Sequence, residues 1–516
     1  LVASSSLARG AIYIRGLAAY RLGPFCKRVP IGKKRPNSAF PLDRVRRQRM
    51  NTEHYDVLII GGGPGGISAA SKVALQGKRA VIINDGPLMG YGIEGAFKSK
   101  ASYEIAREYM HARYREDVFG QIAALDYSKL QNGINRSAAS LTSMLETRLK
   151  RLDVRVVQGK AIFVNDHKIA VGKNEFSGDY IIIATGTRPK KLPNMLVDGK
   201  KVITSDEVIK LTKSPKSILI LGAGVIGCEF ASIFNAVGTE VHLVDTNAQI
   251  MSNEDQDISD FMMNAFHSMD IHVIPSSRYC SHQLQNDSVL TTLSTGEIKT
   301  EIVLLAVGRI PYTAGMNLKA TGVALDERSY IQIDANACTN VPHIYAVGDI
   351  GTRNVPSDLS LVHVAEAEGR RAAAHILGVE DPQGLDHTPY IVFTIPMLAG
   401  AGFTEKYSRK HYGKIRVGKY PYARNHRAHT IQPPIGFVKL IVGPPGDDRI
   451  LGVRAVGPNA DAIIGAAGIM IERNLPYTYI LEAIFPHPSL LECLKGSAHI
   501  IAGDILQYEE GEELNF

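Results

Sequence analysis

Two stretches of the chain share one order of hydrophobic and small residues. The first begins with an apolar run at 55–60 that is interrupted only by Asp56, continues through a glycine-rich stretch at 61–66, and then follows a helical pattern of small residues to Gly77. The second repeats this order between residues 217 and 238. Short apolar runs bounded by glycines are typical of strands buried on both faces. We therefore expect two units of strand, glycine turn and helix.

Both glycine-rich turns match the spacing Gly-x-Gly-x-x-Gly. In such a turn the first glycine allows the tight bend, the second lets a pyrophosphate approach the backbone, and the third lets the helix pack closely on the strand. The helix that follows points its unpaired N–H groups at the phosphates. One such motif is a weak signal, but two copies, each between a strand and a helix, predict two dinucleotide-binding sites. The glycines concerned are Gly61, Gly63, Gly66, Gly222, Gly224 and Gly227.

The residue that ends the second strand of each unit discriminates between nucleotides. In the second unit the strand expected at 241–244 is followed directly by Asp245. A carboxylate there accepts hydrogen bonds from a ribose 2′-hydroxyl and repels a 2′-phosphate. No arginine follows at 246–249, so this site is expected to prefer NAD(H) over NADP(H). In the first unit the matching residues are Asn84 and Asp85, and either could contact an adenosine ribose.

The composition is that of a folded protein of several domains. The chain has 516 residues, 45% hydrophobic and 21% charged, which excludes a disordered polymer, a collagen and a small disulfide scaffold. Its length predicts about two to four domains. The five cysteines are far apart, without a C-x-x-C motif, so neither a disulfide framework nor a metal site is expected. The chain has no run of 18 apolar residues, so no membrane span is expected, and the protein should be soluble or peripheral.

The positive charge is concentrated in the first fifty residues. They hold twelve basic residues and one acidic residue, whereas the rest of the chain holds 46 basic and 50 acidic residues. A basic, serine-containing leader with interspersed apolar residues is typical of a transit peptide, so we expect targeting to the mitochondrion or another organelle. Two alternatives stay open: a basic tail that contacts nucleic acid or membrane, and a start at Met50 that gives an untargeted form. Because the remainder is mildly acidic, the net charge of +7 does not imply a nucleic-acid partner.

Motifs spread over residues 53–510 resemble the class I pyridine nucleotide-disulfide oxidoreductases, the family of lipoamide dehydrogenase, glutathione reductase and the flavoprotein transhydrogenase. Besides the glycine turns, these motifs are IATGTRP, AVGRIP and IYAVGD, and the stretch GAGVIGCEFASIF is most similar to the transhydrogenase. The resemblance implies FAD at the first site and NAD(H) at the second, with Asp349 holding the ribityl chain of the flavin. The other residues that it places at the cofactors are Thr185, Gly186, Gly308, Arg309 and Gly348.

The same resemblance implies an α/β fold of two Rossmann-like domains and a homodimer. An FAD-binding domain is expected at 53–190 and 310–385, interrupted by an NAD-binding domain at 191–309. Residues 386–516 would form a C-terminal α+β dimerisation domain, and the leader would occupy residues 1–50. A nicotinamide nucleotide and an electron acceptor would be the small-molecule partners.

The chain departs from the family at its thiols. The family carries two cysteines separated by four residues, and the corresponding positions here are Tyr91 and Ala96. Neither side chain can exchange with a disulfide, so a disulfide relay is not expected. The family's lysine and glutamate beside the nicotinamide and flavin are retained as Lys100 and Glu229. This predicts that hydride transfer to the flavin survives, although the two residues could also form a structural ion pair only.

Three functions are compatible with this pattern. The first is an oxidoreductase that passes hydride from NAD(P)H through FAD to a non-disulfide acceptor, as in a transhydrogenase or diaphorase. The second is a divergent dihydrolipoamide dehydrogenase with a displaced thiol pair, for which Cys493 is a candidate. The third is a pseudoenzyme that keeps the fold as a binding or structural subunit. His487 and Glu492 match the family's base for thiol chemistry; without a thiol they are either an interface contact or a base for another acceptor.

Overall fold

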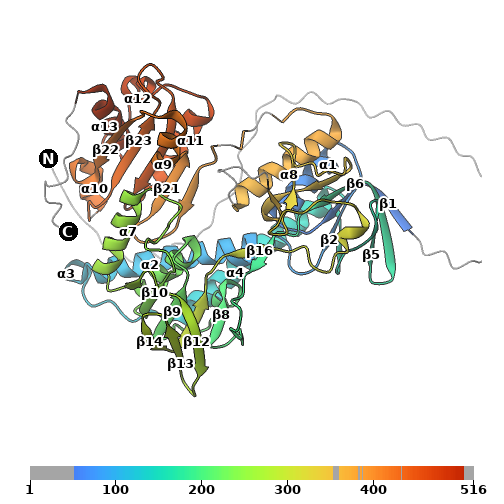
Figure 1. Ribbon diagram of the computed structural model, residues 1–516, viewed down its shortest axis with the longest axis horizontal. Helices are drawn as coiled ribbons and strands as arrows, with labels where there is room; N and C mark the ends of the chain where they lie inside the picture. Colours follow the sequence, from blue (N-terminus) through green and yellow to red (C-terminus); the bar gives the residue numbers. More distant parts are fainter. Residues whose placement is uncertain (1–51, 353–359, 382–383, 386, 432, 505–516) are drawn as a thin grey trace, which may run out of the picture. The chain divides into compact units, whose positions relative to one another are not determined.

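The computed structural model describes residues 52–352, 360–381, 384–385, 387–431 and 433–504. Contacts divide the chain into two units, Leu1–Arg49 and Met50–Phe516. The expected leader at 1–50 lies outside the described residues. The helices and strands therefore all belong to the second unit (Figure 1).

The first sheet has seven strands in the order β3-β2-β1-β6-β5-β4, with β18 beside β6. Strands β3, β2, β1, β6 and β18 are parallel, and β5 and β4 continue the sheet antiparallel. Their bounds are β1 Thr52–Ile60, β2 Ala80–Asn84, β3 Arg155–Gln158, β4 Ile162–Asn165, β5 Lys168–Val171, β6 Asn174–Ile183 and β18 Ile344–Ala346. The expected first strand at 55–60 thus forms and begins three residues earlier.

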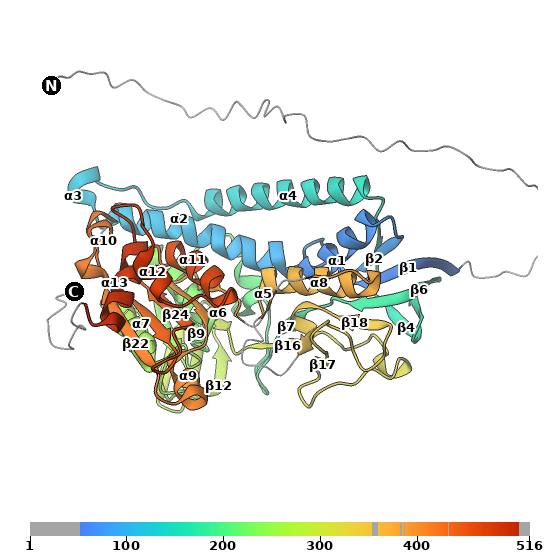
Figure 2. The ribbon, with the colours of Figure 1, turned by 90° about the horizontal axis from the view of Figure 1, so that it is seen from above.

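Side chains of β1 alternate between the two faces of this sheet. Val57 and Ile59 pack into a cluster with residues of the helices α1 (Pro64–Leu75), α4 (Tyr127–Arg151) and α8 (Val362–Leu377). Leu58 and Ile60 point to the other face, into a separate cluster. This alternation is that of a strand buried on both sides, and it explains why residues 57–60 are all apolar. Helices α1 and α8 lie side by side in both views (Figures 1 and 2).

The second sheet repeats the parallel architecture, in the order β11-β10-β9-β15-β8. Between β11 and β15 the chain forms a separate antiparallel sheet, β12-β13-β14. The strands are β8 Val202–Thr204, β9 Ser217–Leu221, β10 Glu240–Val244, β11 His272–Ile274, β12 Tyr279–Leu284, β13 Val289–Leu293, β14 Gly296–Thr300 and β15 Ile302–Leu305. The helices are α5 Ser205–Val208, α6 Val225–Ala236 and α7 Gln256–Ser268.

The chain leaves the first sheet and later returns to it. Strand β7 (Thr187–Pro189) follows β6 and pairs antiparallel with β16 (Arg309–Pro311), which comes directly after the second sheet. The return strand β18 then pairs with β6. The second nucleotide unit is therefore inserted in the first, as expected, while the residue limits of the domains stay predictions. Short elements of the return are η2 Leu318–Ala320, β17 Ile331–Gln332, η3 Gly348–Ile350 and β19 Gly351–Thr352.

The C-terminal part is an antiparallel sheet in the order β20-β21-β24-β23-β22, on which α11 and α13 pack. Its strands are β20 Tyr390–Val392, β21 Leu398–Gly402, β22 Arg416–Pro421, β23 Phe437–Val442 and β24 Ile450–Val456. Its helices are α9 Glu405–Tyr412, η4 Tyr422–Arg424, α10 His426–Ile431, α11 Asp461–Glu472, α12 Thr478–Glu482 and α13 Leu491–Ala502. This is the α+β arrangement expected for this part of the chain.

A π-helical turn, η1 (Gly92–Phe97), leads into helix α2 (Lys98–Arg113), which is followed by α3 (Glu116–Phe119). Helix α2 contacts α4 on one side and α6 on another, and its course along α4 is visible in Figure 2. It therefore links the first nucleotide unit to the second. Among the described residues no helix combines the length and the apolar character needed to cross a bilayer.

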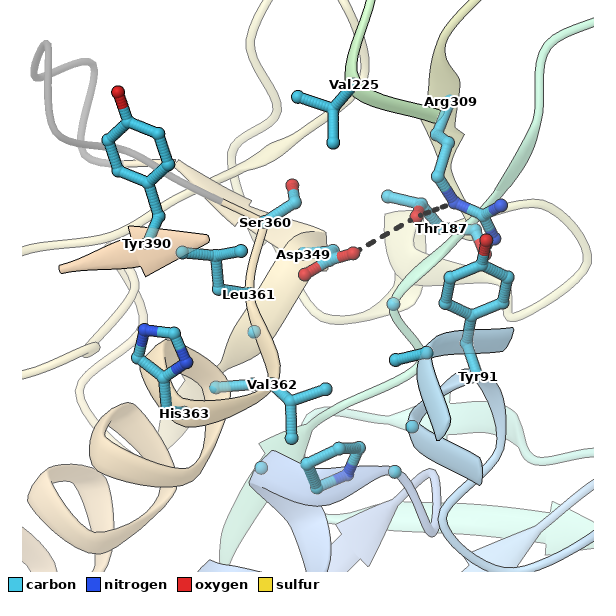
Figure 3. A pocket seen from close by; sticks show the side chains of 18 of the residues that line it. Tyr91, Thr187, Val225, Arg309, Asp349, Ser360, Leu361, Val362, His363 and Tyr390 are labelled. Atoms are coloured by element: carbon cyan, nitrogen blue, oxygen red, sulfur yellow. Dashed lines mark hydrogen bonds between the residues drawn. The ribbon is translucent and has the colours of Figure 1, made fainter. Parts of the chain in front are cut away.

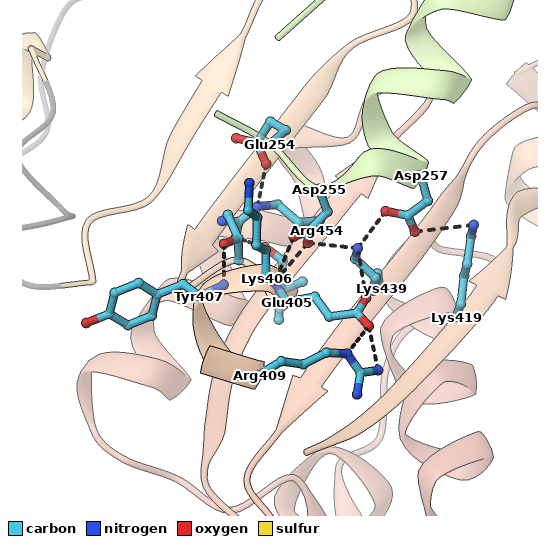
Figure 4. A network of polar contacts seen from close by, with 12 residues as sticks. Glu254, Asp255, Asp257, Glu405, Lys406, Tyr407, Arg409, Lys419, Lys439 and Arg454 are labelled. Atoms are coloured by element: carbon cyan, nitrogen blue, oxygen red, sulfur yellow. Dashed lines mark hydrogen bonds and ion pairs between the residues drawn. The ribbon is translucent and has the colours of Figure 1, made fainter. Parts of the chain in front are cut away.

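A buried network of charges joins α7 to the C-terminal sheet (Figure 4). The side chain of Lys439 on β23 is only 1% exposed, and its Nζ lies 2.8 Å from Asp255 and 2.7 Å from Asp257. Arg454 on β24 is also buried and donates to Glu254 at 2.9 Å. Each buried cation thus has a carboxylate partner from the region around the start of α7, as burial of a charge requires.

Candidate active site

A cavity of about 1480 Å3 opens between the two glycine turns. Its wall combines the first glycine turn, the start of α2, β7, the N-terminus of α6, the start of α8 and β20. In Figure 3, Tyr91 and Arg309 lie together on one side, with Leu361 and Val362 on the other. The expected site residues that line it are Gly61, Gly63, Asn84, Asp85, Lys100, Thr185, Gly186, Gly224, Glu229, Arg309, Gly348 and Asp349.

The remaining expected residues do not line the cavity. Among them Gly66 and Gly227 have a packing role: a Cβ on Gly66 would lie 2.1 Å from the Gly61 carbonyl oxygen, and one on Gly227 1.8 Å from that of Gly222. Only glycine allows helix and turn to approach so closely. The others outside the lining are Gly222, Asp245, Gly308, His487 and Glu492.

The N-termini of α1 and α6 are suited to bind phosphate. Their N-cap residues, Gly63 and Gly224, provide no side chain to accept hydrogen bonds from the first N–H groups of the helix. A Cβ on Gly224 would meet no atom within 4 Å, so the backbone there is open to a ligand. Unpaired N–H groups at a helix N-terminus favour an anion, and both turns therefore fit a pyrophosphate.

Asn84 and Asp245 both hold a glycine turn in place. The Asn84 Oδ1 accepts from the Gly62 N–H at 2.8 Å, and Asp245 accepts from the Ala223 N–H at 2.6 Å and the Asn247 N–H at 2.8 Å. A carboxylate has about four acceptor positions, so Asp245 retains capacity for a ribose hydroxyl. Asp85 is exposed at the edge of the cavity and makes no comparable contact among the described residues.

Asp349 ends a chain of polar contacts that begins at Arg309 (Figure 3). The Arg309 Nε donates to the Thr187 hydroxyl at 2.8 Å, and this hydroxyl donates to the Asp349 carboxylate at 3.3 Å. Burial raises the pKa of Asp349 above its usual value, although Arg309 opposes the shift. The carboxylate lines the cavity, so it can accept from the hydroxyls of a ligand such as a ribityl chain.

Tyr91 and Ala96, the residues expected from the sequence at the positions of the family's two cysteines, both line the cavity. The Arg309 guanidinium lies over the Tyr91 ring, 4.1 Å from its centroid, and this contact was not foreseen from the sequence. The ring also packs against Gly95, where a Cβ would lie 2.4 Å from ring carbons. A tyrosine thus fits here because residue 95 has no side chain.

No cysteine is among the described residues that line the cavity. Cys228 and Cys493 are buried, and burial raises the pKa of Cys493 to about 12, so its thiol stays protonated. Cys280 is exposed and Cys338 half-buried, and no disulfide joins any of these four.

Lys100 and Glu229 form an ion pair across the contact between α2 and α6. The Lys100 Nζ lies 2.8 Å from Oε1 and 2.7 Å from Oε2 of Glu229. The backbone N–H of Phe393 donates to the same carboxylate at 3.0 Å, and the lysine Nζ lies 5.1 Å from the Phe393 ring centroid. The pair therefore sits where both nucleotide units and the C-terminal part of the chain meet, at the wall of the cavity.

His487 and Glu492 are also in contact, away from this cavity. The His487 Nδ1 lies 2.9 Å from the Glu492 carboxylate, and the other ring nitrogen lies 3.4 Å from His426. Sequence reasoning missed His426 because 61 residues separate it from His487 and no motif contains it. It also missed the stretch at 360–363 and Tyr390, which line the cavity through their position in the fold.

Comparison with known proteins identifies the family. Residues 55–369 match the model of the pyridine nucleotide-disulphide oxidoreductases, and residues 388–498 match the dimerisation domain of the same proteins. The chain belongs to this family. Membership supports an FAD-dependent oxidoreductase that uses a nicotinamide nucleotide. The match to the dimerisation domain supports a homodimer.

Individual relatives cover most of the chain. It is 31% identical to a dihydrolipoyl dehydrogenase of Bacillus subtilis, over 84% of this chain and 96% of that protein. It is also 31% identical to a mitochondrial dihydrolipoyl dehydrogenase of Pisum sativum, over 88% and 93%. Among solved structures, the HOCl-induced flavoprotein disulfide reductase RclA from Escherichia coli is 25% identical, with a TM-score of 0.78 over 87% of this chain and all of that one.

Proposed function

We propose that the protein oxidises NADH through FAD and delivers the electrons to an acceptor that is not a disulfide, as a transhydrogenase or diaphorase does. One observation carries the proposal. Tyr91 and Ala96, which the sequence aligns with the family's two cysteines, line the cavity, and the Lys100–Glu229 ion pair lines it too. Tyrosine and alanine cannot undergo thiol–disulfide exchange, whereas hydride transfer from a nicotinamide needs no thiol.

Different residues bind the two cofactors and orient their reacting rings. The N–H groups after Gly61 and Gly222 hold the two pyrophosphates, and Asp349 accepts from the ribityl hydroxyls. FAD supplies the two-electron chemistry when bound. Lys100 places a positive charge beside the reacting rings, and Glu229 fixes the position of its Nζ. Thr185, Gly186, Gly308 and Gly348 shape the backbone around the flavin.

The second site is proposed to prefer NAD(H), because Asp245 presents a carboxylate next to the second glycine turn and no arginine follows it. His487 and Glu492 act either as a contact at the dimer interface or as a base for the acceptor.

The leader at 1–50 is proposed to direct the chain to the mitochondrion, in keeping with relatives named as mitochondrial. A fusion of residues 1–50 to a fluorescent protein that stays diffuse in cells would contradict the targeting role.

A second candidate function is that of a dihydrolipoyl dehydrogenase, which the names of the relatives favour. It would need a thiol pair from elsewhere in the chain. The four described cysteines lie outside the cavity lining, and this is why we place it second. A third candidate is a non-catalytic subunit that keeps the dimeric fold.

An absorption spectrum followed by anaerobic addition of NADH tests the proposal. We expect a yellow protein that is bleached by NADH and reoxidised by thio-NAD+ or a quinone, without turnover of lipoamide. Colourless protein that takes up no FAD would refute the enzyme and favour the third candidate. Lipoamide turnover that depends on one cysteine would favour the second.

The ion pair gives this test a matched control. Lys100→Met should slow bleaching by roughly 10- to 100-fold, because it removes a fixed charge beside the reacting rings. Lys98 is two residues earlier on the same helix and pairs with Glu94 at 2.7 Å, so Lys98→Met should bleach at nearly the rate of the unchanged protein. Equal bleaching rates in the two variants would mean that Lys100 is structural only.

A further inference from the structure

Arg309 connects the two nucleotide units at the junction where the chain passes between them, which β7 and β16 form. Its Nε donates to the Thr187 hydroxyl at 2.8 Å and its Nη2 to the Thr187 carbonyl at 2.9 Å. On the side of the second unit, Nη1 donates to the Ser205 hydroxyl of α5 at 3.1 Å and lies 3.6 Å from the Asp206 carboxylate. The guanidinium is therefore held in place by both the junction and the second unit.

The first unit reaches this guanidinium through Tyr91, whose ring centroid lies 4.1 Å from the guanidinium carbon. A cation over an aromatic ring is attracted by the negative face of the ring. We propose that Tyr91 is a positioning residue for hydride transfer to FAD, a role that rests on the function proposed above. Its ring, held by Arg309, fastens the start of α2 to the junction and so keeps Lys100 in place beside the second unit.

The turn that carries Tyr91 has little side-chain bulk of its own. Glycines occupy positions 90, 92 and 95, and glycine is the residue with the greatest backbone freedom. A Cβ on Gly92 would lie 2.9 Å from Pro64 at the start of α1, and one on Gly95 would lie 2.4 Å from the Tyr91 ring. The turn is therefore packed between the start of α1 and the tyrosine ring, so loss of the ring should loosen it.

The segment from η1 to α2 runs along the second unit, with α2 packed on α6 and η1 in contact with α5. Charged groups fasten it at two places: Tyr91 meets Arg309 at the junction, and Lys100 meets Glu229 on α6. A single fastening would let the two units turn about it, whereas two resist such a rotation. Hydride transfer depends on this precision, because a misplacement of about 1 Å can cost roughly 100-fold in rate.

The ring of Tyr91, and not its hydroxyl, makes the contact with Arg309. Burial raises the pKa of the Tyr91 hydroxyl above its usual value, although Arg309 opposes the shift, so the phenol stays neutral at physiological pH. Arg309 therefore faces an uncharged aromatic ring and not a phenolate. Phenylalanine should serve equally well at this position, whereas leucine has no aromatic face to attract the cation.

Anaerobic stopped-flow reduction of the FAD-loaded, full-length protein by NADH measures the positioning. Tyr91→Leu should lower the limiting rate of bleaching roughly 3- to 30-fold, which corresponds to the loss of one cation–π contact. The apparent dissociation constant of NADH should stay nearly unchanged, because the second glycine turn and Asp245 are untouched. Tyr91→Phe keeps the aromatic face and should bleach at nearly the rate of the unchanged protein.

Tyr109→Leu is the matched control for the loss of the ring. Tyr109 also lies on α2 and has a guanidinium near its ring, that of Arg113 at 5.9 Å, but this contact stays within one helix. We therefore expect Tyr109→Leu to bleach like the unchanged protein. If Tyr91→Leu does not fold, Tyr91→Met removes the ring with a more adaptable side chain and takes its place in every measurement.

Hydrogen exchange of the same variants gives a second readout, which needs no reaction of the flavin. Across the junction the Lys190 N–H donates to the Gly308 carbonyl at 3.0 Å, and the Tyr312 N–H donates to the Gly186 carbonyl at 2.9 Å. Tyr91→Leu should speed the exchange of these two amides roughly 3- to 30-fold, because local opening of the junction becomes easier. Tyr91→Phe should exchange like the unchanged protein.

The two readouts separate this role from the proposed function. Unchanged protein that NADH does not bleach would refute the proposed function, while hydrogen exchange would still decide whether Tyr91 fastens the junction. In a protein that is bleached, unchanged exchange or an unchanged bleaching rate in Tyr91→Leu would overturn the positioning role. So would a Tyr91→Phe variant that bleaches as slowly as Tyr91→Leu, because the hydroxyl would then be the group that matters.

Discussion

Tyr91 is one of the two residues that the sequence places at the positions of the family's cysteines. The residue comes directly before the π-helical turn η1, and Ala96 lies within that turn. Hydrogen bonds in a π-helix join residues five apart, which is the spacing of these two positions. The backbone is therefore shaped to bring residues 91 and 96 together, although neither carries a thiol.

This geometry predicts that the double variant Tyr91→Cys/Ala96→Cys forms a disulfide. Titration of free thiols in the denatured protein should show two fewer after mild oxidation than after reduction. The variant Tyr91→Cys alone should show no such loss, because no other cysteine among the described residues lines the cavity. Unchanged thiol counts in the double variant would mean that the turn holds these positions too far apart for an S–S bond.

Asp245 holds the second glycine turn in place and is also proposed to select NAD(H), so a test of cofactor choice must separate these two roles. Asp245→Ala/Thr246→Arg should raise the ratio of kcat/KM for NADPH to that for NADH about 10-fold or more, by replacing a repulsive charge with an attractive one. The change also removes the acceptor of the Ala223 and Asn247 N–H groups, so total activity should fall. Thr246→Arg alone keeps this support and is the control. An unchanged ratio in both variants would show that the 2′-position lies elsewhere.

The sequence allowed the site residues to be named but not their partners. Asn84 and Asp245 were recognised by their place after a strand, yet their contacts with the glycine turns are to backbone atoms, which leave no trace in the side-chain pattern. The position of the Tyr91 ring under Arg309 depends on the missing Cβ of Gly95, and this packing is visible only in the three-dimensional structure.

At the scale of elements, the strands that the apolar runs predicted do form. The run at 217–221 is β9, and that at 241–244 is β10 with one more residue at its start. Strand β9 is buried and continuously apolar from residue 218 to 221, which makes it easy to recognise, whereas β10 contains the half-buried His242 between apolar residues. The π-helical turn and α10 were not predicted, because a short turn of mixed polarity has no periodic pattern.

The buried Lys439 on β23 should contribute strongly to the stability of the fold. Lys439→Met should lower the free energy of unfolding by about 3–5 kcal/mol, because it leaves the buried Asp255 carboxylate without its cation. Lys419 contacts Asp257 at 3.3 Å but is 27% exposed, so Lys419→Met should cost less than about 1 kcal/mol. Thermal or denaturant unfolding of both variants checks this, and equal losses would contradict it.

The same network sets a pH dependence. Although burial alone would raise the pKa of Asp255, Lys439 and two backbone N–H groups lower it below its usual value. A carboxyl whose folded pKa is lowered stabilises the fold above its unfolded pKa, and this stability is lost as pH falls through the folded value. The stability difference between the unchanged protein and Lys439→Met should therefore be largest near neutral pH and shrink in acid, below about pH 4.

For the whole molecule, motifs far apart in the chain were enough to predict the inserted arrangement of the two nucleotide units. The pairing of β6 with β18 and of β7 with β16 agrees with it. The assembly of two chains was expected from resemblance alone, because a dimer interface on one chain reads as ordinary exposed apolar residues.

Two such residues lie in the dimerisation domain and give the last prediction. Ile469 on α11 is 66% exposed, and Ile484 before α13 is 96% exposed. Isoleucines so exposed on one chain are expected to be covered by the partner, so Ile469→Asp and Ile484→Asp should each weaken the dimer at least about 100-fold, since an unpaired charge would be buried. Leu75 on α1 is 65% exposed but lies outside this domain, and Leu75→Asp should stay dimeric. Sedimentation at micromolar concentration decides the matter: dimers that persist in both isoleucine variants would place the interface on another face.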